Sequence, residues 1–330
     1  MSQHSSNRME RAIAVVHGHT LDKLEELLDW AWSDLVSPLR LEAVLPGGMS
    51  NINIRGRVGD SAILLKVPSL LPPFEENPYD RLFDVSTYLA DAGLVPAALR
   101  VGRLEDNEMT PFIIYEFIDG ERHPSLQDFS LGDLVALKTV RHTLSELSPP
   151  GVPTFRTALD YVESLFSRVS VVIDRHSPVE SEVRDAVAEF LRLGDRLREH
   201  AEGIEDWSVK AMHGDLHEGN LIFSHGRAYL LDLEECAIGD PRIDLAYLRV
   251  QPTEYHNESL LLSLLDGATY DSIRPLEPLA LGFAIGWTLE RLVLLVSDRV
   301  ERNATSGYTK DQMLSYVNTK LREFQKGLST

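Results

Sequence analysis

The sequence has a single cysteine, Cys236, among its 330 residues. One cysteine excludes an intrachain disulfide and any zinc site built from several thiolates. Long apolar runs are also absent, because the longest, 279–289, ends at Glu290 and Arg291, short of the roughly 20 residues that span a bilayer. The first residues lack the apolar stretch of a secretory signal. We therefore expect a soluble cytoplasmic protein.

The chain has fewer basic residues than acidic ones. The chain has 32 Lys and Arg against 51 Asp and Glu, a net charge of −19. This surplus of negative charge repels nucleic-acid phosphates and anionic membranes, so we expect neither as a partner. It is compatible with a cationic ligand, although solubility alone would explain it. The length and the 43% hydrophobic content favour a globular protein with two domains or lobes.

Hydropathy patterns divide the chain into a sheet-rich first part and a helical second part. Before position 118 we expect helices over 21–36 and 79–92 and strands over 41–45, 51–58, 61–67, 98–104 and 112–117. After Gly120 we expect short strands over 209–212, 221–223 and 228–231. The long helices predicted there cover 131–147, 157–173, 181–202, 257–266, 277–299 and 309–326. The pattern predicts an α+β protein with lobes at 1–117, including an N-terminal helical extension over 1–38, and 118–330.

The segment 213–246 carries an unusual density of polar side chains around the short strands. Asp215 and Asn220 lie five residues apart on a predicted loop, and Asp232 directly follows the strand at 228–231. Carboxylate and amide oxygens are ligands that suit Mg²⁺. Protein kinases use this D-x-x-x-x-N spacing followed by a later Asp: the first Asp accepts the proton of the attacking hydroxyl, and the other two residues hold metal.

The run H-G-D-L-H-E-G-N, followed by D-L-E-E-C-A-I-G-D-P-R-I-D-L-A, resembles the aminoglycoside phosphotransferase and choline kinase-like superfamily. These are small-molecule kinases with a bilobal protein-kinase-like fold, having a small antiparallel sheet in one lobe and mainly helices in the other. The resemblance implies that Asp215 is the catalytic base and that His213 steadies its loop. It also implies that Asn220 and Asp232 are magnesium ligands.

The same resemblance implies that Asp240 and Asp244 brace this region. Taken alone, Asp244 is equally typical of the first turn of a helix. Glu234 and Glu235 are typical of solvated surface charge. The joint spacing of Asp215, Asn220 and Asp232, and not any single residue, favours the kinase interpretation.

The first lobe would then hold the nucleotide. Gly47, Gly48, Ser50 and Asn51 form a glycine-containing loop that could approach phosphates, although a plain hairpin turn is the alternative. No Gly-Lys-Ser/Thr follows, so it is not a Walker A loop. Lys66, inside an apolar predicted strand, corresponds by resemblance to the lysine that pairs with the α- and β-phosphates.

Two further features of this lobe are the acidic partner of Lys66 and the segment that would bind adenine. Leu82 stands where the family usually has the glutamate that partners this lysine, and Asp80 and Asp84 flank it, so the partner of Lys66 is left open. Glu116 and Ile118 resemble the segment that binds adenine through its backbone. A buried strand running into a turn is the alternative.

We therefore predict an ATP-dependent kinase that transfers the γ-phosphoryl group to a hydroxyl of a small molecule, with Mg²⁺ as cofactor. The acceptor, the choice of ATP or GTP and the oligomeric state are left open. Tyr247, Trp287 and Glu290 are candidate acceptor residues, since an aromatic ring and a carboxylate three residues apart suit a cationic group. For Trp287, a place in the core of an apolar helix is the alternative.

Two other classes are considered. His213, Asp215 and His217 could form the metal site of a hydrolase, but this assigns no role to Asn220, Lys66 or the glycine loop. A catalytically silent nucleotide-binding protein would fit the missing glutamate opposite Lys66.

Overall fold

The computed structural model describes residues 15–16, 18–31, 37–46, 50–69, 77–106, 109–176, 180–251, 264, 270–297 and 309–328. Their contacts form two compact units. The first contains the described residues up to Ala90 together with Pro96–Ile118. The second contains Asp91–Val95, Asp119–Ser297 and the described residues from Thr309 onward.

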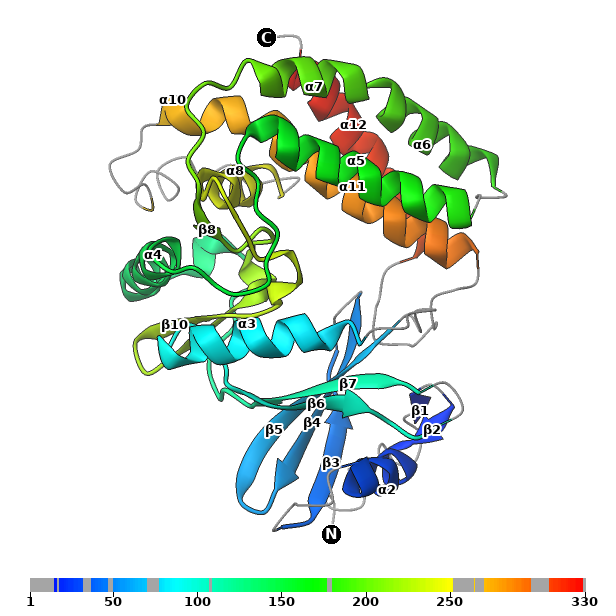
Figure 1. Ribbon diagram of the computed structural model, residues 1–330, viewed down its shortest axis with the longest axis vertical. Helices are drawn as coiled ribbons and strands as arrows, with labels where there is room; N and C mark the ends of the chain where they lie inside the picture. The colour runs from blue at the N-terminus through cyan, green and yellow to red at the C-terminus, as the bar shows by residue number, and fades with distance from the viewer. Residues whose placement is uncertain are drawn as a thin grey trace. The chain divides into compact units, whose positions relative to one another are not determined.

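The first unit is built on a five-stranded antiparallel sheet with the order β3-β4-β5-β7-β6 (Figure 1). Its strands are β3 (Leu39–Val44), β4 (Asn51–Val58), β5 (Ser61–Pro68), β6 (Ala98–Arg103) and β7 (Pro111–Glu116). β4 and β5 form a hairpin in which Val58 faces Ser61. Gly59 supplies the positive φ, +58°, that a tight two-residue turn requires.

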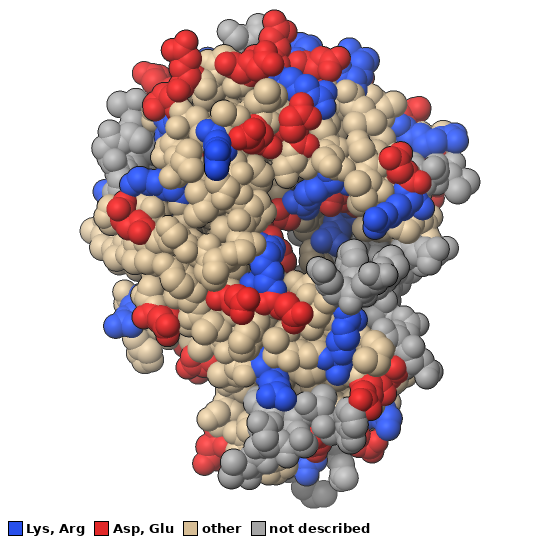
Figure 2. Space-filling view, in the orientation of Figure 1, with Lys and Arg blue, Asp and Glu red and all other residues tan. Residues whose placement is uncertain are grey.

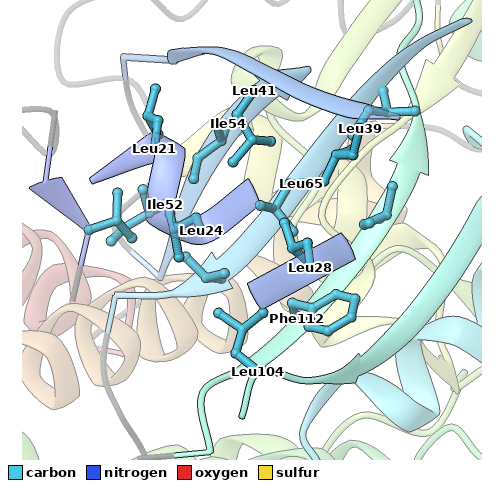
Figure 3. Close-up of a cluster of buried hydrophobic side chains, with 14 residues drawn as sticks. Leu21, Leu24, Leu28, Leu39, Leu41, Ile52, Ile54, Leu65, Leu104 and Phe112 are labelled. Carbon is cyan, nitrogen blue, oxygen red and sulfur yellow. The ribbon is translucent and has the colours of Figure 1, made fainter. Parts of the chain in front are cut away.

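One face of this sheet carries the core of the unit. Alternate strand positions turn apolar side chains to the same side, among them Ile52, Ile54 and Leu65. Helix α2 (Leu21–Ala31) lays Leu21, Leu24 and Leu28 against them, a spacing that places all three on one helical face (Figure 3). A short antiparallel pair, β1 (Val15–Val16) and β2 (His19–Thr20), precedes α2.

Helix α3 (Tyr79–Asp91) is tied to the same sheet by polar contacts. The Tyr79 hydroxyl donates to Asn51 Oδ1 at 2.6 Å, and Ser86 Oγ lies 3.5 Å from the Tyr115 hydroxyl. Residue 93, a glycine with φ +71°, follows the helix, and glycine readily adopts the left-handed conformation common just after a helix ends.

The second unit is mainly helical. Its helices are η1 (Leu126–Asp128), α4 (Leu131–Ser145), α5 (Ala158–Arg175), α6 (Ser181–Arg192), α7 (Gly194–Glu202), η2 (Glu218–Asn220), η3 (Leu233–Glu235), α8 (Arg242–Val250), α10 (Tyr270–Ile273), η4 (Arg274–Leu276), α11 (Glu277–Val296) and α12 (Lys310–Gly327). The single helix predicted over 181–202 is wrong: it is two helices, α6 and α7, which meet at Leu193. The helix predicted over 257–266 lies outside the described residues, apart from position 264.

Helix α11 lies at the centre of this unit and packs on α5, α8 and α12. Glycines allow the closest approach: a Cβ at Gly286 would lie 2.7 Å from Leu165 Cδ1 of α5. The stretch Asp271–Val296 is long and apolar enough for a membrane span, but 72% of its most apolar window is buried inside the protein. Burial against neighbouring helices accounts for this apolar composition without a bilayer.

Four short strands hold the polar segment in place. β8 (Lys210–Met212) pairs with β11 (Ala237–Gly239), and β9 (Leu221–Ser224) pairs with β10 (Arg227–Leu230). The predicted loop 213–220 runs from β8 to β9, and Asp232 lies just after β10. The predicted α+β class, with a sheet-rich first part and a helical second part, is confirmed.

Charged side chains are distributed over the surface. On the face shown in Figure 2, acidic and basic residues are interspersed and not gathered into one patch of either sign. The excess of acidic residues in the sequence therefore forms no single acidic patch on that face.

Candidate active site

The loop after β8 turns sharply at Gly214, where φ is +83°. A Cβ at this position would lie 2.1 Å from the carbonyl oxygen of Glu235, well inside contact distance. Both the backbone conformation and the close approach therefore require glycine. The glycine of the H-G-D run is what allows the loop to lie against the 233–235 segment.

Two buried carboxylates brace this region: Asp244 binds the loop itself, and Asp240 binds the residues on either side of the β8–β11 pair. Asp244, in the first turn of α8, accepts hydrogen bonds from the backbone N–H groups of His213 at 2.9 Å and Gly214 at 2.8 Å. Asp240, which is fully buried, accepts from the Ser208 N–H at 3.0 Å and pairs with the Arg242 guanidinium. Each carboxylate receives several donors, which offsets the cost of burying its charge.

Both ring nitrogens of His213 have hydrogen-bond partners in the backbone. Its Nδ1 accepts from the Asp215 N–H at 3.2 Å, and its Nε2 lies 2.7 Å from the carbonyl oxygen of Leu231. These partners fix the neutral tautomer with the proton on Nε2. His213 therefore has no lone pair for a metal, which argues against the hydrolase site of His213, Asp215 and His217.

One ring nitrogen of His217 also binds the backbone of the loop. Its Nδ1 accepts from the Gly219 N–H at 3.1 Å, and its Nε2 lies 3.9 Å from Asp215 Oδ2. Burial lowers the pKa of His217, which favours the neutral ring.

Backbone and side-chain bonds bring Asp215, Asn220 and Asp232 together. Asn220 Nδ2 donates to the Asp215 carbonyl at 2.9 Å and to Asp215 Oδ2 at 3.1 Å. The N–H of Leu231, next to Asp232, donates to the Asn220 carbonyl at 2.9 Å. Asp232 itself has φ +59°, a left-handed conformation that is uncommon outside glycine and marks a constrained position.

The carboxyl of Asp215 titrates near neutrality. Burial is the main cause, and it raises the pKa of Asp215 to about 7. Glu235 and Asp232 raise it further, whereas His213 and a hydrogen bond from Tyr247 lower it. A pKa close to the working pH is suited to a group that accepts a proton during a reaction.

The donor set fits a magnesium ion. Because Asn220 Nδ2 is bound to Asp215, its Oδ1 is the atom left to face a ligand. One carboxylate, from Asp232, and one amide oxygen match the few protein ligands that Mg²⁺ takes when phosphates supply others. Among the described residues, no group of three or more His, Cys, Asp and Glu is arranged to hold a metal.

In the first unit, Lys66 of β5 is buried, with 7% of its surface exposed. Its Nζ lies 6.0 Å from the centre of the Tyr115 ring. Leu82 is buried at the family's glutamate position, and Asp80 and Asp84 are exposed. The assignment of an acidic partner to Lys66 stays open.

Four other residues of the first unit were predicted to lie near the nucleotide phosphates. Gly47 and Gly48 lie outside the described residues. Ser50 precedes β4, and its carbonyl accepts from the Ser69 N–H at 2.9 Å. Asn51 begins β4 and is bound to Tyr79, so its side chain helps to fix α3.

At the end of β7, the Glu116 N–H donates to the Ala97 carbonyl at 2.9 Å. The next amide, of Phe117, donates to the Ala62 carbonyl at 3.2 Å. An adenine contact at Glu116 would therefore use its carbonyl oxygen, with Ile118 the next residue able to offer an N–H.

The three acceptor candidates differ in surroundings. Tyr247 is 4% exposed and donates a hydrogen bond to Asp215, so it supports the carboxylate. Glu290 is 8% exposed. Trp287 is half-buried, and the guanidinium of Arg291 lies 5.3 Å from the centre of its ring.

Three polar residues near this site were not predicted: Tyr161, Arg168 and Arg291, which share electrostatic interactions with one another or with Glu235. Arg122 is a further one, since it interacts with Asp232. The adjacency of Glu290 and Arg291 on an apolar helix was the one signal in the sequence. The interpretation of Glu235 as solvated surface charge is wrong, because its side chain is paired with Arg168 and interacts with Asp215.

The fold is that of a kinase-like phosphotransferase. A thermostable mutant of aminoglycoside phosphotransferase APH(4)-Ia in its apo form is similar, with a TM-score of 0.62 and 18% identity over 93% of this chain and 100% of that one. The same enzyme in a ternary complex with ADP and hygromycin B has a TM-score of 0.57, with 18% identity over 92% and 98% of the chains.

A choline/ethanolamine kinase family protein from Mesorhizobium loti has a TM-score of 0.60 and 19% identity, over 93% of this chain and 97% of that one. No curated protein sequence matches the chain. Residues 43–279 match the phosphotransferase enzyme family (APH). This match covers well over half of the chain, which therefore belongs to that family. The resemblance seen in the sequence and the predicted bilobal kinase-like fold are confirmed.

Proposed function

We propose that the protein is an ATP-dependent kinase that transfers the γ-phosphoryl group to a hydroxyl of a small molecule. The observation that carries this proposal is the meeting of Asp215, Asn220 and Asp232 on one loop system, bound together by the hydrogen bonds described above. Membership of the phosphotransferase family supports it. The ADP bound in the APH(4)-Ia complex supports ATP as the co-substrate.

Asp215 acts on the acceptor. Its carboxylate accepts a hydrogen bond from the acceptor hydroxyl, aligns the oxygen with the γ-phosphorus and takes the proton as the new bond forms. A raised pKa makes the carboxylate a stronger base than an exposed Asp. Asn220 and Tyr247 hold that carboxylate in position, so the hydroxyl meets it already oriented.

Asn220 Oδ1 and Asp232 would hold Mg²⁺, which neutralises charge on the nucleotide phosphates when it is bound. His213 keeps the two halves of this site in register, because its ring bridges the Asp215 N–H and the Leu231 carbonyl. In the first unit we assign Lys66, Gly47, Gly48, Ser50 and Asn51 to the phosphates and the backbone at Glu116 and Ile118 to the adenine.

The acceptor is assigned only as a small molecule with a hydroxyl group. The hygromycin B in the APH(4)-Ia complex supports this class and does not identify the acceptor of this chain. Family membership leaves the choice open, so the acceptor must be found by experiment.

An ATP-consumption screen tests the proposal. The purified protein is given Mg²⁺–ATP with amines, amino alcohols, sugars and aminoglycosides, and ADP is measured. We expect acceptor-dependent ADP formation that the Asp215→Asn variant lacks. Hydrolysis of esters with Zn²⁺ or Mn²⁺ and no nucleotide would contradict the proposal, as would binding of Mg²⁺–ATP without turnover of any acceptor.

A further inference from the structure

Three elements of the second unit bring charged side chains together beside the candidate base. Arg168 of α5 donates to Glu235 Oε2 at 2.5 Å and to Glu290 Oε2, of α11, at 3.3 Å. The close approach of α11 to α5 at Gly286 makes this possible, since Arg168 and Glu290 each lie about one helical turn further along. One guanidinium is thus shared between two carboxylates.

This cluster adjoins Asp215. The backbone of Glu235 presses against Gly214, the residue before Asp215. Glu235 also contributes to the raised pKa of Asp215, which requires the two carboxylates to be near one another. A molecule bound at the cluster would therefore lie next to the group that receives the proton.

Several buried polar atoms of the cluster lack a hydrogen-bond partner within the part of the chain that the structure describes. They are Glu290 Oε1, Arg291 Nε and the Tyr161 hydroxyl. Glu290 and Tyr161 are 8% and 7% exposed, so bulk water reaches neither side chain freely. Buried polar atoms without partners are costly, and a ligand that offers donors and acceptors would satisfy them.

The charges around these atoms nearly cancel, so the cluster has little excess negative charge with which to attract a cationic ligand. Both carboxylates are already paired with Arg168. They raise the pKa of Arg168 although burial opposes them, so the guanidinium stays charged. A second guanidinium, from Arg291, lies over the ring of Trp287. Glu234 adds one more negative charge near Arg291. An incoming polycation would meet the fixed positive charges of Arg168 and Arg291 beside these acids, and Glu235 and Glu290 are each already bound to Arg168 through one oxygen.

We propose that Tyr161, Arg168, Glu235, Glu290 and Arg291 form the acceptor site, and that the acceptor is an uncharged polyhydroxyl compound such as a sugar or cyclitol. Hydroxyl groups both donate and accept, so neighbouring hydroxyls of one ligand satisfy Glu290 Oε1, Arg291 Nε and the Tyr161 hydroxyl together. A quaternary ammonium group can do neither.

The inference rests on the proposed function, in which one bond to phosphorus forms as another breaks. The reacting hydroxyl gives its proton to Asp215, and its oxygen forms a bond to the γ-phosphorus of ATP. The bond between that phosphorus and the β–γ bridging oxygen breaks, and ADP leaves with the electron pair.

The wild-type protein gives the first test. With Mg²⁺–ATP, kcat/KM is measured for neutral sugars and cyclitols, for choline, for hydroxy amino acids and for aminoglycosides. We expect the best neutral polyhydroxyl acceptor to exceed every charged class by about 100-fold or more, because a ligand that fits less well leaves buried polar atoms of the site unpaired. A charged acceptor with the highest kcat/KM overturns the inference and leaves the proposed function intact.

Variants give the second test, with the best acceptor as probe. Glu290→Gln and Arg291→Met each remove one side of the site. We expect each to raise KM for the acceptor by about tenfold or more, while KM for ATP changes by less than about twofold. The matched control is Glu163→Gln, which also removes an arginine-paired carboxylate, but at an exposed position of α5, where Glu163 binds Arg198 at 2.7 Å. Its kinetics should equal those of the wild type.

The remaining outcomes of these tests are also decisive. If Glu290→Gln and Arg291→Met bind the acceptor normally, these residues do not form its site. If a variant fails to fold, as seen by circular dichroism, the wild-type acceptor ranking decides alone. If no acceptor of any class is phosphorylated, the proposed function and the inference fail together.

Discussion

Asp215 shows how one buried carboxyl is made reactive at a cost to the fold. Its pKa rises to about 7 mainly through burial, and two further carboxylates, Glu235 and Asp232, add to the rise. The folded protein therefore disfavours the charged form relative to an unfolded chain. Because the ordinary pKa is 3.8, this cost to the free energy of unfolding develops as pH rises from about 4 to about 7 and is fully present above 7.

The Asp215→Asn variant should separate chemistry from stability. We expect kcat to fall by about 10² to 10⁴-fold, since proton transfer is lost. In the absence of divalent metal at pH 8, the melting temperature should rise by several degrees, because removing the buried charge recovers at most about 4 kcal/mol. Steady-state kinetics and calorimetry measure the two effects. A variant that keeps its activity, or that melts well below the wild type, would contradict this account of Asp215.

Tyr247 is expected to tune the same carboxyl. Its hydroxyl donates to Asp215 and in turn accepts from Gln251 Nε2, and Gln251 Oε1 accepts from the Tyr316 hydroxyl at 3.1 Å. A donor to a carboxylate stabilises its charged form, so its loss raises the pKa. In Tyr247→Phe, the acid limb of the profile of kcat against pH should move to higher pH.

Tyr316→Phe serves as the control for Tyr247→Phe, since it removes the far end of this chain of hydrogen bonds. Its acid limb should move less. Equal shifts in the two variants, or no shift in Tyr247→Phe, would show that Tyr247 does not act through Asp215.

At the scale of elements, the site depends on a loop that several short pieces hold from different sides. β8 and β9 fix its ends, α8 supplies Asp244 to its backbone, and the segment after β10 receives the ring of His213. The loop therefore has little freedom to move independently. The tightest point is Gly214, which lies against the carbonyl of Glu235.

Two glycines of similar backbone conformation test this point. Gly214 has φ +83° and no room for a Cβ, whereas Gly226, in the turn between β9 and β10, has φ +74° and nothing within 4 Å. We expect Gly226→Ala to cost about 1–2 kcal/mol, the penalty of the left-handed conformation. Gly214→Ala should cost distinctly more and abolish phosphotransferase activity. Urea unfolding measures the difference, and equal costs would contradict the crowding at Gly214.

Periodicity was sufficient to predict most elements, because apolar positions in β4, β5 and α5 repeat at the spacing their structure requires. It failed at 181–202, where the apolar pattern continues across the break at Leu193 and hides it. Asp215, Asn220 and Asp232 were predictable because they lie within 18 residues and their spacing is itself the signal. Arg168 and Arg291 were not, since only the packing of α5 on α11 brings them to the site.

At the scale of the whole molecule, each unit carries its own set of polar side chains. The second unit contains Asp215, Asn220 and Asp232, and the first contains the buried Lys66. A kinase of the family to which the chain belongs would use polar residues of both units to bind the nucleotide. Binding of Mg²⁺–ATP should then raise the stability of the folded protein as a whole.

Asp232→Asn should lose this stabilisation. At about 100 times its dissociation constant, Mg²⁺–ATP should stabilise the wild type by about 2.7 kcal/mol and raise its melting temperature by about 5 °C or more. We expect most of the rise to disappear in Asp232→Asn and to persist in Asp195→Asn, which changes an exposed acid elsewhere in the second unit. A full rise in Asp232→Asn would exclude it as a metal ligand.

Transfer of labelled phosphate from ATP to an acceptor is the sharpest test of the proposed reaction. The protein is incubated with Mg²⁺ and a hydroxyl acceptor, in parallel with ATP labelled at the γ- or the α-phosphate, and the acceptor is separated and counted. We expect label to enter the acceptor only from γ-labelled ATP and only with Asp215 intact. Label released solely as inorganic phosphate, or equal transfer by Asp215→Asn, would contradict it.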